Sequence, residues 1–511
     1  MALLLGVDVG TTNCKAGVFD ESGRMVRFCK SSTVTHHDAD GAAWYDPEQM
    51  WQGIAQIIRN ATADLPEGER IDAVSVASMG EAGVPVDRHN QPLYPIISWF
   101  DPRSMPQADQ IERVIGRERA FRITGLDIGP IFSVPKIMWL RSNEPEVFRR
   151  TARWLCITDL VYLKLAGVHA TDYSIASRTM AFDITRGQWS EEILGPLELD
   201  ASLFPEPVPA GSLVGCITAE AAGATGLLEG TPVVAGGHDH LCGSLASGIL
   251  LGRRVFDSSG TSESIHTLVE PGSELLSAQQ GFRIGRYVDP RFLYVAGGIV
   301  SSGVCVDWAL GISGGEMSYR DAMCAAAGAA PGSRGLLFLP HMRGSGAPHW
   351  DPRSRGAILG LTPSHTRAEI MRSVIEGLCF EVRIILEAMS ELVEDEVDGL
   401  TVMGGGASSS FWQQTKADIT GLPVEVPDVS EATAMGAAML AGIGIGVYTD
   451  TRNASTRTYR SKHTYQPRSE NRLAYDQLYS AYREFYPAVA DLSHRLSHVV
   501  TSNGCPGPEG V

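Results

Sequence analysis

The chain has 511 residues, of which 44% are hydrophobic and 20% charged, and its formal net charge is −17. Roughly two or three domains are expected, because a chain of this length exceeds one hydrophobic core, and the composition is that of an ordinary soluble globular protein. The negative balance argues against nucleic acid as a partner, because no basic patch is available to displace counterions.

Cysteine usage and hydropathy argue against a secreted or membrane protein. Nine cysteines occur singly, without a Cys-x-x-Cys pair, which is typical of reduced thiols in the cytoplasm rather than of a disulfide framework or a zinc site. The apolar start reaches Asp8 too early for a signal peptide, so a first strand is expected there. The uncharged run at 432–447 is shorter than the roughly 20 residues of a membrane helix and is interpreted as a buried helix.

The chain opens with the pattern strand, turn, strand. Residues 3–9 are apolar and β-prone, Gly10, Thr11 and Thr12 form a turn, and residues 14–19 return. A second strand follows directly and no G-x-x-x-x-G-K-[ST] motif occurs, so the pattern excludes a P-loop or Rossmann enzyme. Backbone N–H groups of such a turn, with the two threonine hydroxyls, suit the β- and γ-phosphates of a nucleotide.

A carboxylate, Asp8, stands immediately before this turn. It is a candidate Mg²⁺ ligand that would act through water, because Mg²⁺ gives up its hydration shell reluctantly. The alternative is a strand-end carboxylate that only caps the turn. Lys15, on the returning strand, is interpreted as a strand-surface lysine more readily than as a phosphate ligand.

The most informative single residue is Asp239. It follows a Gly-Gly turn within residues 234–243 and precedes a run of small residues that opens a helix. Phosphoryl transfer needs a group that accepts the proton of the attacking hydroxyl, so Asp239 is the candidate general base. It could also be the N-cap of a helix that starts near His240, and the two roles are compatible.

Two histidines, His238 and His240, flank the candidate base. A His-x-His pair can bind a metal, but no further ligand stands at a suitable spacing, so a metal site is the weaker interpretation. His240 is instead expected to hydrogen-bond a hydroxyl of the substrate.

The second half of the chain repeats the opening pattern. Residues 254–258 form a strand, Gly260, Thr261 and Ser262 form a second phosphate-type turn, and residues 264–269 return. An ordinary hairpin turn is the alternative for the second turn. Two copies of one α/β topology, packed around a cleft, are therefore expected.

The boundary between the copies is expected near residues 246–254. This division gives an N-terminal domain, a C-terminal domain and a disordered tail, at 1–248, 249–500 and 501–511. Apolar residues at three- and four-residue spacing predict two long amphipathic helices, around 370–392 and 475–485.

Together these motifs resemble the FGGY carbohydrate kinases of the actin-like and hexokinase-like ATPase superfamily. Residues 356–361, followed after seven residues by 369–376, fit the family's C-terminal signature at every constrained position. The signature around Lys136 fits that lysine and Trp139 but departs at flanking positions such as Ile131. Further matches lie at 99–103, 171–177, 404–406 and 434–438. The resemblance implies two ribonuclease-H-like domains, with ATP and sugar in the cleft between them.

The resemblance also implies roles for residues whose spacing alone says little. It implies an ATP- and Mg²⁺-dependent kinase with Asp239 as base and Asp8 at the metal. The resemblance assigns adenosine and phosphate contacts to Gly303, Gly404, Gly405, Gly406 and Gln414, beside the turns at 10–12 and 260–262. Glycines there allow backbone to approach a flat base without interference from Cβ.

The resemblance also implies an acceptor site. Glu81 stands where relatives place a residue that touches sugar hydroxyls, and Trp99 stands where they place a ring that stacks on the carbon chain. Glycerol kinases have Arg in place of Gly80 and Tyr in place of Ile131, which counts against glycerol. The Met-His pair of typical xylulokinases and gluconokinases is replaced by Gly80-Glu81, which puts xylulose and gluconate in doubt. A carboxylate in the pocket should repel sugar acids. A neutral ketose or polyol of four to six carbons, in the xylulokinase-like class, is expected.

The competing hypothesis is a non-catalytic actin-like ATP-binding sugar sensor or a pseudokinase. It predicts loss of Asp239, an altered acceptor pocket or an added peptide-binding domain; the base is present, and few residues remain after the last motif. A pseudokinase that retains the base is not distinguished by the sequence. The expected location is the cytoplasm, and the sequence is silent on assembly, for which a homodimer is the working expectation.

Overall fold

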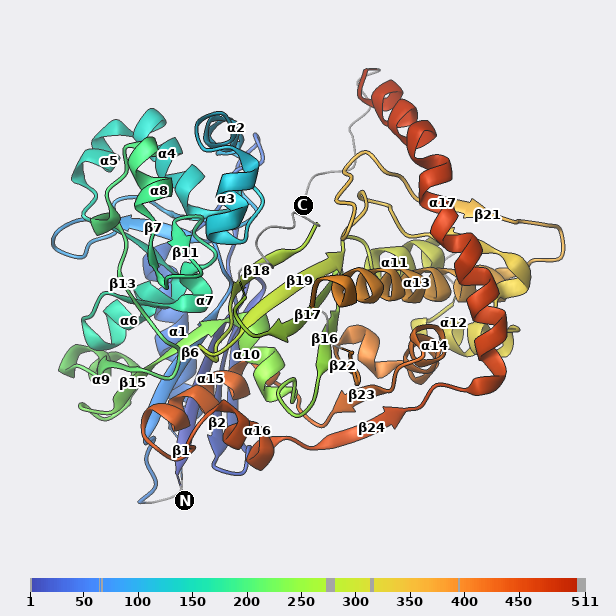
Figure 1. Ribbon diagram of the computed structural model, residues 1–511. Coiled ribbons are helices and arrows are strands. Elements are labelled where there is room, and N and C mark those ends of the chain that lie inside the picture. Colours follow the sequence, from blue (N-terminus) through green and yellow to red (C-terminus); the bar gives the residue numbers. More distant parts are fainter. Residues whose placement is uncertain are drawn as a thin grey trace.

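The computed structural model describes residues 2–502, apart from residues 64, 66–67, 273–280, 313–316 and 394–395. The predicted disordered tail lies outside the described residues except for 501 and 502, which end the last helix, α17 (Ser469–Ser502). Figure 1 shows two sheets lying next to each other, with most of the helices on the outside of the molecule.

The first sheet has six strands in the order β14-β15-β6-β1-β2-β3. These strands are β1 (Leu3–Val9), β2 (Asn13–Asp20), β3 (Met25–Ser32), β6 (Ala73–Ser78), β14 (Leu213–Cys216) and β15 (Pro232–His238). The predicted opening hairpin is β1 with β2, which pair antiparallel, whereas β1, β6 and β15 run parallel. Every residue of β1 is buried, because helices cover the sheet on both faces, and its sequence is accordingly a nearly continuous apolar run.

The second sheet has seven strands in the order β18-β19-β17-β16-β22-β23-β24. These are β16 (Arg254–Ser259), β17 (Glu263–Val269), β18 (Arg283–Arg286), β19 (Leu293–Ile299), β22 (Gly399–Gly404), β23 (Val424–Pro427) and β24 (Ser461–Tyr465). Again a hairpin, β16 with β17, is followed by strands β22 and β23 that run parallel to β16. Both sheets thus contain three antiparallel strands continued by two parallel ones, which confirms the repeated ribonuclease-H-like topology.

Long helices cover these sheets. Helix α1 (Pro47–Thr62) packs on β2 and β3, and α13 (Arg367–Val393) packs on the second sheet with α11 (Gly303–Ile312), α12 (Tyr319–Gly328) and α14 (Ser410–Thr420). The helices predicted around 370–392 and 475–485 are therefore confirmed as α13 and α17.

Helix α15 (Ala432–Gly444) connects the two halves. Although it follows the second sheet in sequence, it packs on β1, β6 and β15 of the first sheet, beside α10 (Asp239–Ala246). The contact is so close that a Cβ on Gly6 would lie 1.7 Å from the carbonyl oxygen of Ala434. The run predicted as a buried helix is thus confirmed, and it covers a strand, β1, that lies more than 400 residues earlier in the sequence.

A smaller five-stranded sheet, in the order β4-β5-β8-β7-β9, lies beside the first sheet together with the helices at the upper left of Figure 1. Its strands are β4 (His36–His37), β5 (Ala43–Tyr45), β7 (Gly83–Val86), β8 (Ile96–Ile97) and β9 (Arg153–Cys156). The neighbouring helices are α2 (Met105–Val114), α3 (Arg117–Thr124), α4 (Ser133–Asn143), α5 (Pro145–Arg150), α6 (Ile157–Ala166), α7 (Tyr173–Ala176) and α8 (Glu191–Leu194). The segments β6–β7 and β8–α2 carry Glu81 and Trp99 to the centre of the molecule.

The remaining short elements connect these layers. They are β10 (Ala170–Asp172), β11 (Phe182–Asp183), β12 (Gln188–Trp189), β13 (Glu206–Val208), α9 (Ala219–Thr225), β20 (Leu337–Leu339), β21 (Ala357–Leu359), α16 (Thr451–Thr458) and the 3₁₀ turns at 195–197, 201–203, 333–335 and 405–408. None of the helices that the structure describes is long and apolar enough to cross a membrane. The cysteines of the described chain are all free thiols.

Candidate active site

A cavity of about 420 Å³ lies where the two sheets meet. Its walls include Thr11 of the first hairpin, Ser262 of the second hairpin, Asp239, and the expected acceptor residues Glu81 and Trp99. Residues from both halves of the chain therefore face one space, which we call the central cavity.

The turn of the first hairpin is fixed by its neighbours. Gly10 donates its N–H to the carbonyl of Asn13 (3.1 Å), and Thr33 on the far side holds the carbonyls of Gly10 and Thr12 through its hydroxyl (2.7 Å) and its N–H (2.9 Å). The hydroxyl of Thr11 accepts a hydrogen bond from the indole N–H of Trp99 (3.0 Å). The predicted phosphate turn and the predicted acceptor wall are thus directly connected.

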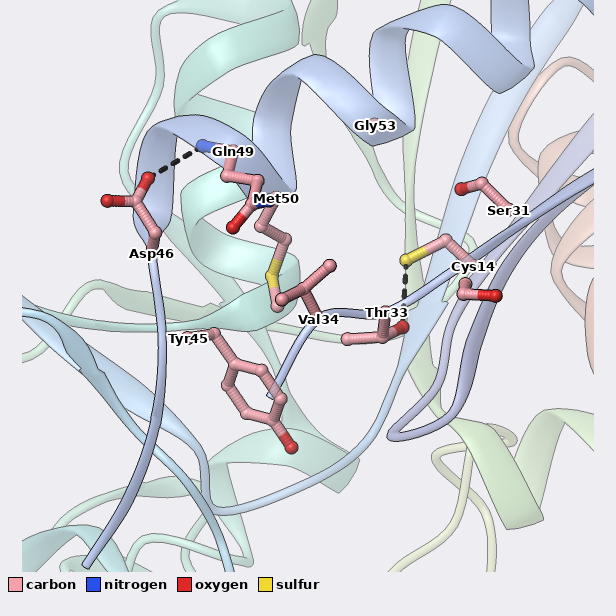
Figure 2. Close-up of a pocket in the computed structure, with 10 residues that line it drawn as sticks. Cys14, Ser31, Thr33, Val34, Tyr45, Asp46, Gln49, Met50 and Gly53 are labelled. Atoms are coloured by element: carbon pink, nitrogen blue, oxygen red, sulfur yellow. Dashed lines mark hydrogen bonds between the residues drawn. The ribbon is translucent and has the colours of Figure 1, made fainter. Parts of the chain in front are cut away.

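A second, much smaller cavity of about 30 Å³ lies behind this turn, next to helix α1 (Figure 2). Cys14 and Thr33 line it, with their Sγ and Oγ1 atoms 3.4 Å apart. Burial raises the pKa of the Cys14 thiol to about 11, so it is not a reactive thiolate. This cavity has room for water only and belongs to the support of the first hairpin.

Asp8 lies at the end of β1 and is buried. Burial, and then the negative charge of Asp239, raise the pKa of Asp8 to about 7, against the opposing effect of Lys15. The Nζ atom of Lys15 lies 3.6 Å from the Asp8 carboxylate and 3.0 Å from that of Glu431. Lys15 therefore pairs with two carboxylates.

Asp239 is the first residue of α10, and the N-cap is His238. The alternative role of Asp239 as N-cap is therefore wrong, because the strand β15 continues through His238 and the helix begins one residue earlier than expected. The Oδ1 atom of Asp239 accepts the N–H of His240 (2.6 Å). A carboxylate in the first turn is stabilised by the helix dipole, while the side chain stays partly open to the central cavity.

The two flanking histidines differ in exposure. His240 is exposed at the cavity, whereas burial lowers the pKa of His238 to about 3, so that His238 stays neutral. In the part of the chain that the structure describes, no group of three or more His, Cys, Asp or Glu side chains could hold a metal ion.

The second hairpin is anchored to the start of α11. Gly303 donates its N–H to the carbonyl of Gly260 (2.9 Å), and Ser302 donates to that of Thr261 (3.0 Å). A Cβ on Gly303 would lie 2.7 Å from the Gly260 oxygen, so only glycine fits this approach. Gly303, predicted at the nucleotide site, thus supports the second turn.

A buried charge cluster lies directly beneath that turn. Lys416 of α14 contacts Asp257 of β16 and, at 2.7 Å, Glu263 of β17, and the three side chains are fully buried. Glu263 also accepts a hydrogen bond from Ser302 (2.8 Å). Burial and the charge of Glu263 raise the pKa of Asp257 to about 8, against the opposing charge of Lys416.

Gly404 ends β22 and the other two glycines follow it, and Gly404 and Gly406 lie beside Ser259. Gly404 has a φ of +85°, and a Cβ there would lie 2.4 Å from the Ser259 carbonyl oxygen. Gln413 donates to the carbonyl of Gly406 (2.8 Å). Gln414, the residue predicted to contact adenosine, donates instead to Asp418 and to the carbonyl of Gln466 (both 2.8 Å).

Glu81 forms an ion pair that the sequence did not predict. Its Oε1 atom accepts hydrogen bonds from Nε (2.7 Å) and NH2 of Arg178, and both side chains are buried. The buried Lys136 donates to the backbone carbonyls of Glu81 (2.8 Å) and Ile131 (2.6 Å). Because cations surround Glu81, its charge no longer gives a reason to exclude sugar acids.

Sequence reasoning missed several residues that line the central cavity. They are Arg178, His266, Arg283, Tyr294 and Trp350. Arg178 directly follows the motif at 171–177, which was a usable signal. The others lie on strands of the second sheet or, for Trp350, on the loop between β20 and β21, and no local pattern marks them.

Comparison with known proteins gives matches over nearly the whole chain. The model of the N-terminal domain of the FGGY family of carbohydrate kinases matches residues 3–246, and that of the C-terminal domain matches residues 257–445. The chain is 28% identical over 499 residues to "Xylulose kinase" of Lactococcus lactis, covering 97% of this chain and 99% of that one. It is 29% identical over 504 residues to "Glycerol kinase" of Carboxydothermus hydrogenoformans, covering 94% and 96%.

Solved structures agree with these sequence matches. A crystal structure of a "xyloylose kinase" from Brucella ovis superposes with a TM-score of 0.88 at 26% identity, over 96% of this chain and all of that one. Xylulose kinase from Rhodospirillum rubrum superposes with a TM-score of 0.90 at 24% identity, over 96% and 100% of the two chains, which supports the fold. Since the two domain models together cover most of the sequence, the chain belongs to the FGGY family of carbohydrate kinases.

Proposed function

We propose that this carbohydrate kinase transfers the γ-phosphoryl group of ATP to a hydroxyl of a small ketose or polyol of four to six carbons. One observation supports this most strongly: Asp239, both hairpin turns and the acceptor residues Glu81 and Trp99 line a single cavity. A base, two phosphate-binding turns and a sugar-sized space in one place are what phosphoryl transfer to a hydroxyl requires.

In the proposed reaction, Trp99 packs against the carbon chain of the acceptor while Glu81 and His240 bind its hydroxyls. Asp239 accepts the proton of the attacking hydroxyl as the new P–O bond forms and the bond between γ-phosphorus and the bridging oxygen breaks, which releases ADP. The turns at 10–12 and 260–262 hold the phosphates through backbone N–H groups.

The residues at the first hairpin fit a divalent cation. Burial, and then the charge of nearby Asp239, raise the pKa of Asp8, and a divalent cation held by Asp8 would offset the repulsion between the two carboxylates. Asp8 would hold Mg²⁺ through water, because this ion gives up its hydration shell reluctantly. The ion would supply charge neutralisation on the transferred phosphate.

We place adenosine against Gly404, Gly405 and Gly406, with Gly303 behind the second turn, and Gln414 stays a predicted contact. The domain division at 1–248 and 249–500 is supported by the repeated topology and by the family-domain matches, which end at residue 246 and resume at 257. The cytoplasmic location and the homodimer stay predictions.

Acceptor-stimulated release of ADP tests this proposal. The enzyme is assayed with Mg-ATP and neutral ketoses, polyols, aldoses and sugar acids of four to six carbons, beside Asp239→Asn and, as a control, Asp109→Asn on the exposed face of α2. One strong acceptor is expected. Removing the base should lower kcat by about 10²–10⁴-fold, with the Kd for ATP nearly unchanged.

The outcome separates the enzyme from the sensor. Near-normal turnover of Asp239→Asn would exclude Asp239 as the base. ATP binding without stimulation of ADP release by any acceptor would favour the non-catalytic sensor or pseudokinase.

A further inference from the structure

Arg283, on β18, is a cation of the central cavity whose donors are unused. Its guanidinium carbon lies 4.8 Å from the centroid of the Trp350 ring. Within the described residues its side chain donates no hydrogen bond and forms no ion pair, whereas Arg178 beside it is bound to Glu81. Stacking on a ring fixes the plane of a guanidinium and leaves the N–H groups at its edge available.

Within the described residues no carboxylate forms an ion pair with Arg283. Glu81 and Asp127 act on its charge at longer range, and Glu81 already accepts two donors of Arg178 on a single oxygen. Burial, together with the positive charge of Arg178, holds the pKa of Arg283 below its ordinary value. A partly buried cation with unsatisfied donors is costly unless a ligand supplies the missing acceptor.

A second unpartnered group lines the same cavity. His266 is 1% exposed, and its Nε2 atom has no hydrogen-bond partner in the described structure. The indole N–H of Trp350 is not available to a ligand, because it is bonded to the carbonyl of Gly281. Among the residues that the structure describes, the Arg283 guanidinium and the Nε2 atom of His266 thus have no hydrogen-bond partner.

We propose that Arg283 binds an oxygen of the acceptor that only accepts hydrogen bonds, either the keto oxygen of a ketose or the carboxylate of an aldonate. A guanidinium has donors and no acceptor, so it favours such an oxygen over a hydroxyl, and most of all an anionic one. A plain alditol lacks this group. The inference rests on the proposed function in taking the central cavity as the acceptor site. It excludes plain alditols from the proposed acceptors, keeps ketoses and adds aldonates.

Binding without ATP tests this inference independently of turnover. For each chain length from four to six carbons, the Kd of the ketose, its alditol and its aldonate is measured by calorimetry or by tryptophan fluorescence, because Trp99 and Trp350 line the cavity. The five-carbon set is D-xylulose, xylitol and D-xylonate. In one set, the Kd of the ketose or of the aldonate is expected to be lower than that of the alditol by about tenfold or more, as for a charge-assisted hydrogen bond.

Three variants assign the preference to Arg283. Arg283→Met should bring the three Kd values within about threefold of one another, and Arg283→Lys, which keeps the charge but not the planar fork, should retain part of the preference. Arg286→Lys is the matched control on the same strand, since Arg286 bonds to the carbonyls of Ile184 and Thr185 outside the cavity. Its preference should equal that of the wild type, and the Tm of each variant confirms folding.

The possible results separate the inference from the proposed function. Tighter ketose binding identifies a keto oxygen, and tighter aldonate binding identifies a carboxylate; both support the role of Arg283. Three results would overturn the role of Arg283: an alditol that binds as tightly as the ketose and aldonate of the same length, a preference that survives Arg283→Met, or no binding in any set. Preferential binding without ADP release would support the role of Arg283 and contradict the proposed kinase activity. ADP release stimulated by alditols alone would support the kinase activity and contradict the role of Arg283.

Discussion

Glu81 shows how the environment of one side chain determines what it can do. Its carboxylate is shared between Arg178 and the central cavity, while its backbone carbonyl is bound by Lys136. Its φ of +61° is unusual for a residue other than glycine and holds the side chain at the turn after β6. The acceptor wall is therefore a charge-balanced unit rather than a single negative group.

Glu81→Gln should mainly weaken sugar binding. The variant keeps one oxygen acceptor but loses the charge that pairs with Arg178, so the KM for the sugar should rise about tenfold or more, with kcat and the KM for ATP changed less. Initial-rate kinetics with the acceptor from the substrate panel measures this. Glu118→Gln, on the exposed face of α3, is the control; an unchanged sugar KM would remove Glu81 from the acceptor site.

His266 makes stability depend on pH. Burial, followed by the neighbouring His240, lowers its pKa from 6.5 to about 3. The unfolded chain therefore takes up a proton between these values while the folded chain does not, and stability is lost as the pH falls below 6.5.

His266→Leu should remove this loss. The free energy of unfolding of the variant, relative to wild type, should rise by about 2 kcal/mol between pH 6.5 and 4.5, from roughly 1.4 kcal/mol for each pH unit. Urea denaturation at several pH values gives the comparison, with the exposed His89→Gln as control. Parallel curves for wild type and variant would show that His266 is protonated in the folded state.

At the residue scale, the sequence predicted those groups that local spacing marks. Asp8, Asp239 and the two turns were recognisable because each motif is continuous in sequence, and the structure brings Thr11, Asp239 and Ser262 to one cavity. Arg283 and His266 were not, because their meaning comes from strands that meet only in the folded sheet. The catalytic and binding roles of Asp8, Asp239 and the two turns stay predictions.

At the element scale, Lys416 joins the second hairpin to helix α14. Its ammonium is enclosed by Asp257 and Glu263 with no exposure to solvent. Buried charges of this kind are stable only as a complete set, because removal of one partner leaves the others uncompensated.

Lys416→Met should lower the free energy of unfolding by about 3–5 kcal/mol, since the Glu263 carboxylate would remain buried without its cation. Adding Glu263→Gln to this variant should recover part of the loss, and Lys462→Met on the exposed strand β24 should have little effect. Chemical denaturation measures all three. A loss no greater than that of the Lys462 control would show that the cluster is solvated or protonated in solution.

Element boundaries were less predictable than element types. Both hairpins followed from β-prone runs on either side of a glycine turn, and the long helices α13 and α17 followed from apolar periodicity. The start of α10 did not, because whether Asp239 is the N-cap or the first helical residue depends on how far β15 continues to pair with β6. A tertiary contact thus decides a local feature.

At the scale of the whole molecule, α15 binds the two halves together. A helix from the end of the second half covers β1, β6 and β15, so the first sheet is covered by residues from the other half of the chain. The sequence predicted α15 as buried but gave no indication of which sheet it covers, because helix periodicity does not identify a partner.

Gly6→Ala should disrupt the contact between β1 and α15. A Cβ there would meet the Ala434 carbonyl at 1.7 Å, so α15 must shift, at a cost of about 1–3 kcal/mol or more in unfolding free energy. Gly223→Ala, in α9 with no atom within 4 Å of the new Cβ, is the matched control and should stabilise by roughly 0.5–1 kcal/mol. Thermal unfolding distinguishes the two; equal stability of both variants would contradict the close packing.

The same helix has a consequence for synthesis. Strand β1 is made more than 400 residues before α15, so the face that α15 covers stays open until then. Contacts of such sequence separation form late and slow folding, and the apolar face of a nascent N-terminal half stays open to other chains meanwhile. We expect newly made protein to depend on chaperones until residue 444 has emerged, and a ribosome stalled before that point to hold a half that aggregates.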